Sequence, residues 1–335
     1  MADLSPYHAL RDYLARADER AVYRAWPRHI ARQLNLEPHT ALEALVEAMF
    51  AGDAILHWEI VCPACGAQNE ETDWLRRARH DYVCAACGGS FAPHLDREVQ
   101  VTFSPHPTLR ALSLTAPDPE FLARIHQQFA PTTAHELLTV QRFRDWARDE
   151  PLPDGEYLEV GRAVIWFSDL TGSTALYARN GDPLAYQLVR QHFDLVFGAI
   201  QDAQGAVVKT MGDGVMGVFT SAERGLRAAL AAHQALAGFN TERALSGDRR
   251  LALKIGMHMG PTITVTLNER LDYFGTTVNV AARAADLARG GETVFTEALL
   301  VEEGAQAIIA GRAVESFRAS VRGLDQELTH YRLTW

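Results

Sequence analysis

Residues 162–174 read RAVIWFSDLTGST, an apolar run that ends in an aspartate and a glycine-containing turn. The apolar run predicts a buried strand, and the turn after Asp169 predicts the start of a helix. Backbone N–H groups at a helix start bind anions, but an adjacent carboxylate repels a bare phosphate unless a divalent cation lies between them. Asp169 therefore points to a cation and phosphate site, although a plain N-capped helix explains the same residues.

A second polar segment, KTMGDG (209–214), separates two further apolar runs, and its central Gly-Asp-Gly turn is typical of a β-hairpin. If the hairpin lies beside the first strand, Asp169 and Asp213 can share two metal ions, because Mg²⁺ prefers carboxylate oxygens. A plain Gly-Asp-Gly turn is the alternative interpretation. The chain has only two lysines, Lys209 and Lys254, so a lysine inside this segment indicates a need for a compact ammonium group.

The third segment, LDYFGTTVNVAAR (271–283), precedes and enters a predicted helix. Asn279 and Arg283 are four residues apart, so they share one helical face. A helix with a capping asparagine and a solvated arginine is the alternative interpretation. Around the three segments, the β-α-β-β-α-β succession of patterns predicts the α+β class with a ferredoxin-like arrangement. The long helices are expected over residues 183–205, 221–239 and 276–291.

Together the three segments resemble the catalytic domain of class III nucleotidyl cyclases, the adenylyl and guanylyl cyclase family, over residues 158–335. The resemblance implies that Asp169 and Asp213 bind two Mg²⁺ or Mn²⁺ ions, with the Leu170 carbonyl as an extra ligand. Arg322 lies where relatives often have a lysine that contacts the terminal phosphates. Thr171, Gly172, Ser173 and Thr174 are the expected phosphate ligands in the turn after Asp169. Ser173 departs from the family, in which many members carry phenylalanine at this position.

The same resemblance implies roles for the other polar residues. Lys209 and Asp272 look like the pair that reads the purine base, and Asn279 looks like the residue that orients the ribose. Arg283 is similar to the arginine that stabilises the transition state. The implied reaction converts a nucleoside triphosphate into a 3′,5′-cyclic monophosphate and pyrophosphate. Because the family builds each active site from two cyclase domains, the chain is expected to form a homodimer with two sites.

Hydrogen-bonding groups predict which base fits. Lys209 can only donate and ionised Asp272 can only accept. Adenine offers an acceptor at N1 and a donor at its 6-amino group, whereas guanine has the reverse order, so ATP is the predicted substrate. Cytosine has the same order as adenine, and a cyclase of a pyrimidine or guanine nucleotide stays an alternative. A nucleotide-sensing or transcription-regulating protein without enzyme activity is the alternative of a different class.

The four cysteines form two CxxC pairs, Cys62 with Cys65 and Cys84 with Cys87. The spacing of the pairs matches that of a four-cysteine zinc site. Four thiolates complete a tetrahedral shell and leave no position open for chemistry, so a structural Zn²⁺ is predicted. A disulfide pair and a redox CxxC are the alternatives, and a reducing compartment disfavours the disulfides.

The residues before the cyclase-like region are expected to form three parts: a winged-helix-like module (1–58), the zinc ribbon (59–104), and a helical connector and hinge (105–157). The helices of the connector are expected over 118–149, and EPLPDG (150–155) is the hinge. The expected recognition helix of the first module carries Glu43 and Glu47, where DNA phosphates require basic or amide groups. We therefore expect this half to bind a regulatory ligand or protein rather than nucleic acid.

The chain has 335 residues and a formal net charge of −10, with 47% hydrophobic and 22% charged residues. These values fit a globular protein of two or three domains and exclude a disordered or fibrous chain. The acidic balance argues against broad nucleic-acid binding. No apolar run reaches the length of a membrane span, and the charged N-terminus lacks the apolar region of a secretory signal, so a cytoplasmic protein is expected.

Overall fold

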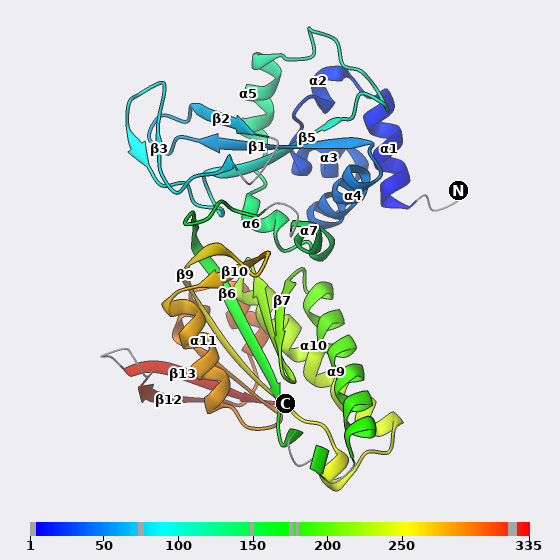
Figure 1. Ribbon diagram of the computed structural model, residues 1–335, viewed down its shortest axis with the longest axis vertical. Helices are drawn as coiled ribbons and strands as arrows, with labels where there is room; N and C mark the ends of the chain where they lie inside the picture. The colour runs from blue at the N-terminus through cyan, green and yellow to red at the C-terminus, as the bar shows by residue number, and fades with distance from the viewer. Residues whose placement is uncertain (1–4, 73–76, 148–150, 174–176, 179–180, 321–326) are drawn as a thin grey trace. The chain divides into compact units, whose positions relative to one another are not determined.

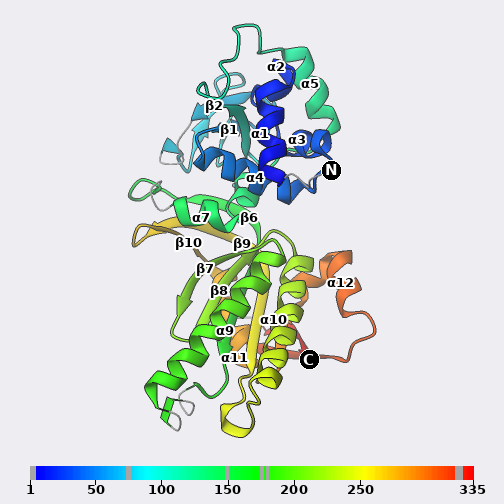
Figure 2. The ribbon, with the colours of Figure 1, turned by 90° about the vertical axis from the view of Figure 1, so that its right-hand side faces the viewer.

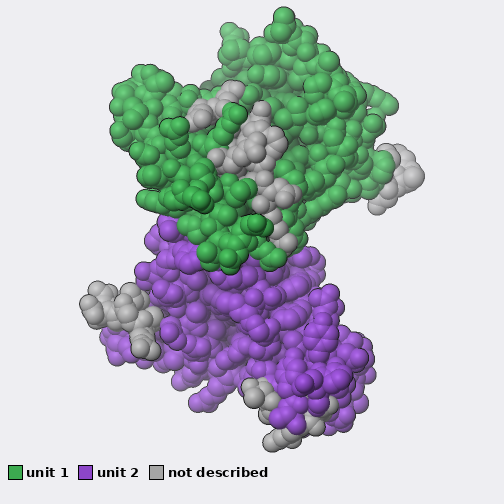
Figure 3. Space-filling view, viewed as in Figure 1, with its two compact units in different colours: residues 1–160, 264–271 green, residues 161–263, 272–335 purple. Residues whose placement is uncertain are grey.

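The computed structural model describes residues 5–72, 77–147, 151–173, 177–178, 181–320 and 327–335. The chain divides into two compact units (Figure 3), residues 1–160 with 264–271 and residues 161–263 with 272–335. Among the described residues, no helix is both long and apolar enough to cross a bilayer.

The N-terminal unit combines helices with a three-stranded antiparallel sheet (Figure 1). Its helices are α1 (Pro6–Arg16), α2 (Glu19–Val22), α3 (Pro27–Leu34), α4 (Pro38–Phe50), α5 (Pro119–Gln128), α6 (Ala134–Leu137) and α7 (Gln141–Trp146). Its strands are β1 (Ala54–Val61), β2 (Gln68–Thr72), β3 (Tyr82–Val83), β4 (Ser90–Phe91) and β5 (Val99–Pro105). β1 pairs with both β2 and β5, and β3 pairs with β4.

Helix α4 follows from its apolar periodicity. Leu42, Leu45 and Val46 are buried on one face, whereas Glu43 and Glu47 are exposed. An amphipathic helix of this kind is held mainly by burial of its apolar face. The acidic side chains therefore lie in solvent, as the sequence indicates.

This unit differs from the sequence expectations in two places. β1 crosses the expected boundary at residue 58 and pairs with β5 from Ala54 to Ile60, so the expected wing strand is the central strand of a sheet. The helical stretch expected over 118–149 is divided into α5, α6 and α7. The break before α6 contains Pro131, which has no N–H to continue a helix, and a capping box of Thr133 and Glu136 starts a new one.

The C-terminal unit is built on one eight-stranded sheet. Its strands are β6 (Leu158–Leu170), β7 (Ala206–Met211), β8 (Gly214–Phe219), β9 (Leu253–Leu267), β10 (Arg270–Phe274), β11 (Glu292–Thr296), β12 (Val314–Ser320) and β13 (Glu327–Thr334). Its helices are α9 (Asp182–Asp202), α10 (Ala222–Glu242), α11 (Thr276–Leu287) and α12 (Glu303–Ile309), with short 3-10 turns at Gly247–Arg249 and Glu297–Val301.

The strands of this sheet follow the order β12-β13-β11-β9-β6-β8-β7, and β10 pairs with β9 outside this path. β6 and β8 are antiparallel, as are β8 and β7, whereas β11 runs parallel to β9. Helices α9 and α10 lie side by side over the sheet (Figure 2). The elements from β6 to β9 therefore follow the β-α-β-β-α-β succession that the sequence predicts.

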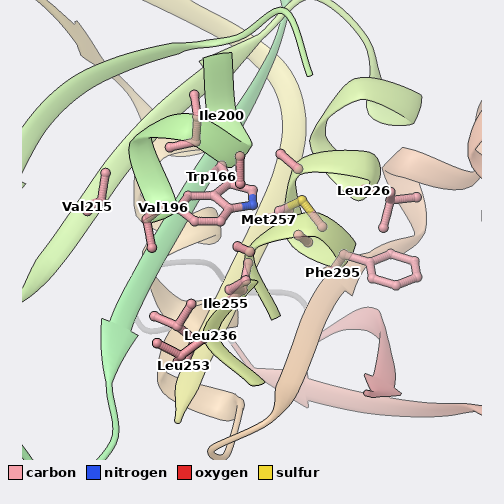
Figure 4. Close-up of a cluster of buried hydrophobic side chains, with 14 of the residues drawn as sticks. Trp166, Val196, Ile200, Val215, Leu226, Leu236, Leu253, Ile255, Met257 and Phe295 are labelled. Atoms are coloured by element: carbon pink, nitrogen blue, oxygen red, sulfur yellow. The ribbon is translucent and has the colours of Figure 1, made fainter. Parts of the chain in front are cut away.

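A large apolar core forms where α9 and α10 pack on the sheet (Figure 4). The side chains drawn and labelled there are Trp166, Val196, Ile200, Val215, Leu226, Leu236, Leu253, Ile255, Met257 and Phe295. Burial of each large apolar side chain contributes about 1.5–3 kcal/mol. Trp166 is fully buried and lies three residues before Asp169 on β6, so the core fixes the strand end that carries the aspartate.

Candidate active site

Two aspartates lie at adjacent positions of the sheet. Asp169 is near the end of β6, and Asp213 is in the turn that joins β7 to β8. β6 pairs with β8, with Ser168 opposite Val215. A Cβ atom on Gly214 would lie 2.8 Å from the Ser168 carbonyl oxygen and 3.6 Å from Asp169 Oδ1. The turn that carries Asp213 therefore packs directly against Asp169, and a side chain at position 214 would collide with β6.

Asp213 has an unsatisfied carboxylate oxygen. Its Oδ2 atom is buried and has no hydrogen-bond partner among the described residues. Such an atom is costly unless a ligand satisfies it. Asp169 is the adjacent carboxylate, and paired carboxylate oxygens are the ligands that Mg²⁺ and Mn²⁺ accept. The two aspartates therefore fit the divalent metal site that the sequence predicts.

Lys254 lies beside this pair, and the sequence analysis assigned it no role. It is on β9, and its Nζ atom lies 2.8 Å from Asp169 Oδ2. The ammonium group offsets part of the negative charge that the two aspartates bring together. The one signal in the sequence was the rarity of lysine, and it could not show which strand lies beside β6.

A buried histidine interacts electrostatically with both carboxylates. His192 on α9 is fully buried, and its Nδ1 atom lies 2.7 Å from the Val189 carbonyl oxygen. Burial lowers the pKa of His192, against the opposing effects of that hydrogen bond and of Asp213 and Asp169. Burial therefore favours the neutral form of His192. In the sequence, His192 lies on an apolar helix face, and nothing there indicates that it is close to the two aspartates.

The two residues predicted to read a base are in direct contact, although 63 positions separate them. Lys209 on β7 donates through Nζ to Asp272 Oδ2 on β10. Asp272 is 5% exposed, and its Oδ1 atom accepts from the Tyr273 N–H at 2.8 Å. The Lys209 ammonium also lies 5.7 Å from the centre of the Phe274 ring. The structure thus places one donor and one acceptor side by side.

Asn279 and Arg283 lie on the exposed side of α11, as their spacing predicts. Arg283 Nη1 lies 2.8 Å from Asp286 Oδ2, three residues further along the helix. An exposed ion pair of this kind contributes little to stability. The guanidinium can therefore exchange this partner for a phosphate oxygen at little cost.

The residues predicted to bind phosphate are described in part. The turn after β6 contains Thr171, Gly172 and Ser173. Leu170 is buried, and the Thr171 N–H donates to the Ala252 carbonyl at 2.8 Å, which ties this turn to the residue before β9. The other two predicted phosphate ligands, Thr174 and Arg322, lie outside the described residues.

The four cysteines converge, as predicted. Their Sγ atoms all lie within 4.8 Å of one another, with 3.8 Å between Cys62 and Cys87 and 3.6 Å between Cys65 and Cys84. A tetrahedral ion with bonds of about 2.3 Å to sulfur separates its ligands by about 3.8 Å. A disulfide would require about 2.05 Å, so the cluster fits a metal ion and no disulfide forms among these cysteines.

The two CxxC turns share one backbone conformation. Gly66 (φ 71°) and Gly88 (φ 74°) each follow a pair, and each N–H donates to the carbonyl of the first cysteine of its pair, at 2.9 and 2.8 Å. This left-handed conformation favours glycine. The backbone N–H groups of Cys87 and Ala86 lower the pKa of Cys84 to about 7, which favours its thiolate. The pKa of Cys65 is raised to about 12, because the hydrogen bond from the Ala67 backbone, which lowers it, is outweighed by burial and by the sulfur atoms of the other three cysteines.

Two family models cover most of the chain. Residues 157–324 match the adenylate and guanylate cyclase catalytic domain, and residues 1–133 match a family of unknown function (DUF5939). The first match spans half of the chain and includes the paired aspartates, the Lys209–Asp272 pair and α11. The chain therefore belongs to the family of adenylate and guanylate cyclase catalytic domains.

Curated relatives carry cyclase names. An adenylate cyclase of Anabaena cylindrica is 28% identical over 199 residues, which cover 54% of this chain and 39% of the relative. A putative adenylate cyclase of Rhizobium meliloti is 32% identical over 137 residues, 41% of this chain and 22% of the relative. The chain thus spans less than half the length of these two relatives.

Solved cyclase structures are also similar. An adenylyl cyclase from P. aeruginosa is 18% identical with a TM-score of 0.45, over 54% of this chain and 96% of that chain. An adenylate/guanylate cyclase/hydrolase from Silicibacter pomeroyi is 24% identical with a TM-score of 0.46, over 54% of this chain and 99% of that chain.

Proposed function

We propose that this chain is an adenylyl cyclase, which converts ATP into 3′,5′-cyclic AMP and pyrophosphate. The observation that carries the proposal is the buried, unsatisfied Oδ2 atom of Asp213 beside the carboxylate of Asp169. A structural carboxylate would have a protein donor at this atom. The base-reading pair and the exposed Arg283 on the same chain complete the set of groups that the reaction needs.

The reaction forms a bond between the ribose 3′-oxygen and the α-phosphorus, breaks the bond to the pyrophosphate oxygen, and releases the 3′-hydroxyl proton to solvent. Asp169 and Asp213 would hold two Mg²⁺ or Mn²⁺ ions, with the Leu170 carbonyl as a further ligand. Such ions, when bound, promote loss of the 3′-hydroxyl proton and neutralise phosphate charge. Asn279 orients the ribose for in-line attack. Arg283 donates its N–H groups to the phosphate oxygens as charge develops in the transition state.

The contact between Lys209 and Asp272 supports adenine as the base. The ammonium donates to adenine N1, and the carboxylate accepts from the 6-amino group. Guanine presents a donor to Lys209 and an acceptor to Asp272, which leaves buried polar groups unpaired. We infer that ring size separates adenine from cytosine, which has the same order of groups.

We propose that two copies of the chain form head-to-tail sites. In each site one copy would supply the paired aspartates, and the other would supply Lys209, Asp272, Asn279 and Arg283. Two equivalent sites then follow from the twofold symmetry of a homodimer. The N-terminal unit, with its expected parts 1–58, 59–104 and 105–157, is proposed to be regulatory.

Product identification tests the proposed function. Purified full-length protein is incubated separately with ATP, GTP, CTP and UTP, with Mg²⁺ or Mn²⁺, and the products are separated by chromatography. Cyclic AMP from ATP is expected, with at least about 100-fold less product from GTP because unpaired buried groups penalise guanine. A different cyclic nucleotide would overturn the base assignment. Absence of any cyclic product would overturn the enzyme assignment.

We further propose that the four cysteines hold one structural Zn²⁺. The Sγ separations and the two matched turns support a tetrahedral ion, and thiolate ligands favour Zn²⁺ over Mg²⁺. A closed four-sulfur shell supplies folding energy and no catalytic position. The ion would join the connection between β1 and β2 to the connection between β3 and β4. Strands β3 and β4 have two residues each and are too short to form a stable sheet alone.

Replacement of one zinc ligand is expected to destabilise the N-terminal unit. A Cys62→Ser variant should lose the bound metal, from about one ion per chain to none, and lower the Tm by about 10 °C. Metal content by elemental analysis and unfolding by calorimetry measure the two effects. Ser90→Ala, an exposed change on the neighbouring strand β4, is the matched control and should alter neither. A structural ion would be contradicted if purified wild-type protein contained no zinc. It would also be contradicted if removal of the zinc by a chelator left the Tm unchanged.

A further inference from the structure

The tip of the hairpin formed by β9 and β10 belongs to the N-terminal unit, although it lies within the residues that match the cyclase family. β9 and β10 are joined by Asn268 and Glu269, both with positive φ (50° and 61°), as in a two-residue type I′ turn. Residues 264–271 of this hairpin belong to the same compact unit as residues 1–160 (Figure 3). The chain passes back into the catalytic unit between Leu271 and Asp272.

A buried arginine holds this hairpin at that point. Arg144 on α7 is 6% exposed, and its Nη2 atom donates to the Leu271 carbonyl oxygen at 2.6 Å. Burial of a guanidinium is costly unless its N–H groups have acceptors, and a charged donor makes a stronger hydrogen bond than a neutral one. The contact is therefore a strong and specific tie between α7 and β10.

A second tie holds the other strand of the hairpin. The Leu152 N–H donates to Thr266 Oγ1 on β9 at 2.7 Å. Leu152 follows α7 in the chain and is itself buried. A residue on α7 and a residue between α7 and β6 thus contact one strand of the hairpin each.

The hydrogen bond from Arg144 is accepted by the peptide group that joins Leu271 to Asp272, the residue proposed to read the base. The Leu271 carbonyl and the Asp272 nitrogen belong to one planar peptide group, so the place of the carbonyl oxygen constrains the Asp272 Cα atom. The carboxylate of Asp272 is itself held by Lys209 and by the Tyr273 N–H. Loss of the arginine contact would release the backbone at this point and let the carboxylate shift relative to Lys209.

We propose that Arg144 is a positioning residue for Asp272, through which the segment before the cyclase region sets the recognition of the adenine base. This inference rests on the proposed function, because it concerns how ATP is distinguished from GTP. Arg144 contacts no reacting atom in this scheme. Its effect should therefore appear in nucleotide affinity and base selection, and only weakly in kcat.

Steady-state kinetics of full-length variants test this role. Arg144→Met keeps the length of the side chain and removes its donors. We expect KM for ATP to rise about tenfold and the ATP-to-GTP ratio of kcat/KM to fall about tenfold, with kcat within about threefold of wild type. Arg144→Lys, which keeps one charged donor, should restore part of the ratio. Arg142→Met, an exposed change on the same helix, is the matched control and should behave as wild type.

A second variant keeps the test decisive if Arg144→Met does not fold. Thr266→Val removes only the acceptor of the Leu152 N–H and should lower the ATP-to-GTP ratio about threefold. An unchanged ratio in a folded Arg144→Met, or in Thr266→Val when Arg144→Met is unfolded, would overturn the positioning role. A loss of kcat alone with an unchanged ratio would do the same. A wild-type protein that makes no cyclic nucleotide would instead overturn the proposed function.

Discussion

Asp213→Ala is expected to lower the rate of cyclic AMP formation by at least about 10³-fold, because it removes a carboxylate proposed to bind both metal ions. The buried Oδ2 atom of Asp213 has no hydrogen-bond partner among the described residues, so its removal breaks no described hydrogen bond at that atom. Stability should therefore change little or rise slightly. Product formation and thermal unfolding, measured on the same preparation, separate the two effects.

Asp202→Ala is the matched control for this variant. Asp202 is an exposed aspartate at the end of α9, outside the proposed site. Its replacement should leave the rate within about twofold of wild type, because exposed substitutions away from a site have small effects. Asp213→Ala with near wild-type activity in the presence of Mg²⁺ or Mn²⁺ would rule out Asp213 as an essential metal ligand.

Arg283→Ala is expected to lower kcat by about 10²- to 10³-fold with a smaller change in KM, because its N–H groups act mainly on charge that develops in the transition state. Arg283→Lys should recover only part of the rate, since an ammonium cannot reproduce the planar fork of donors. Initial-rate measurements over a range of ATP concentrations give both constants. Arg227→Ala removes a comparable exposed helical ion pair, with Glu223 on α10, and should keep wild-type kinetics.

Mixing the two inactive variants tests whether the sites are shared. Equal amounts of Asp213→Ala and Arg283→Ala chains should recover about one quarter of wild-type activity, because half of random dimers are mixed and each mixed dimer has one intact site of two. Subunit exchange is verified with two affinity tags. Verified mixed dimers without activity would show that each site is built from a single chain.

The sequence correctly predicted several elements of the catalytic unit. Residues 162–169 lie in one strand that is buried from Ala163 to Ser168, the turn at Asp213 joins two strands, and Asn279 and Arg283 share an exposed helical face. These features depend on local patterns: apolar runs, glycine turns and helical spacing. The cysteine pairs were equally readable, because the CxxC turn is a local structure that each pair forms by itself.

The N-terminal unit was harder to predict for a physical reason. Whether β1 is an outer wing or a central strand depends on its pairing with β5, which lies about 40 residues further along the chain. The sequence of a short strand does not indicate which strand it pairs with. The expected end of the first module at residue 58 therefore falls in the middle of β1. Pro131 and the capping box that begins at Thr133 are local signals for the division of the connector into α5, α6 and α7. The prediction of one helical stretch did not use them, because the whole stretch has a helical pattern.

By itself, the sequence predicted which residues would serve cyclase chemistry, and it placed several of them correctly, with Asp169 at a strand end, Asp213 in a turn and Arg283 on a helix. Only the tertiary structure decided which of them meet. Lys254 reaches Asp169 because β9 pairs beside β6, and Arg144 reaches the Leu271 carbonyl because the hairpin folds onto α7. Contacts between residues so far apart in the chain arise from strand order and packing, and neither is encoded in a local pattern.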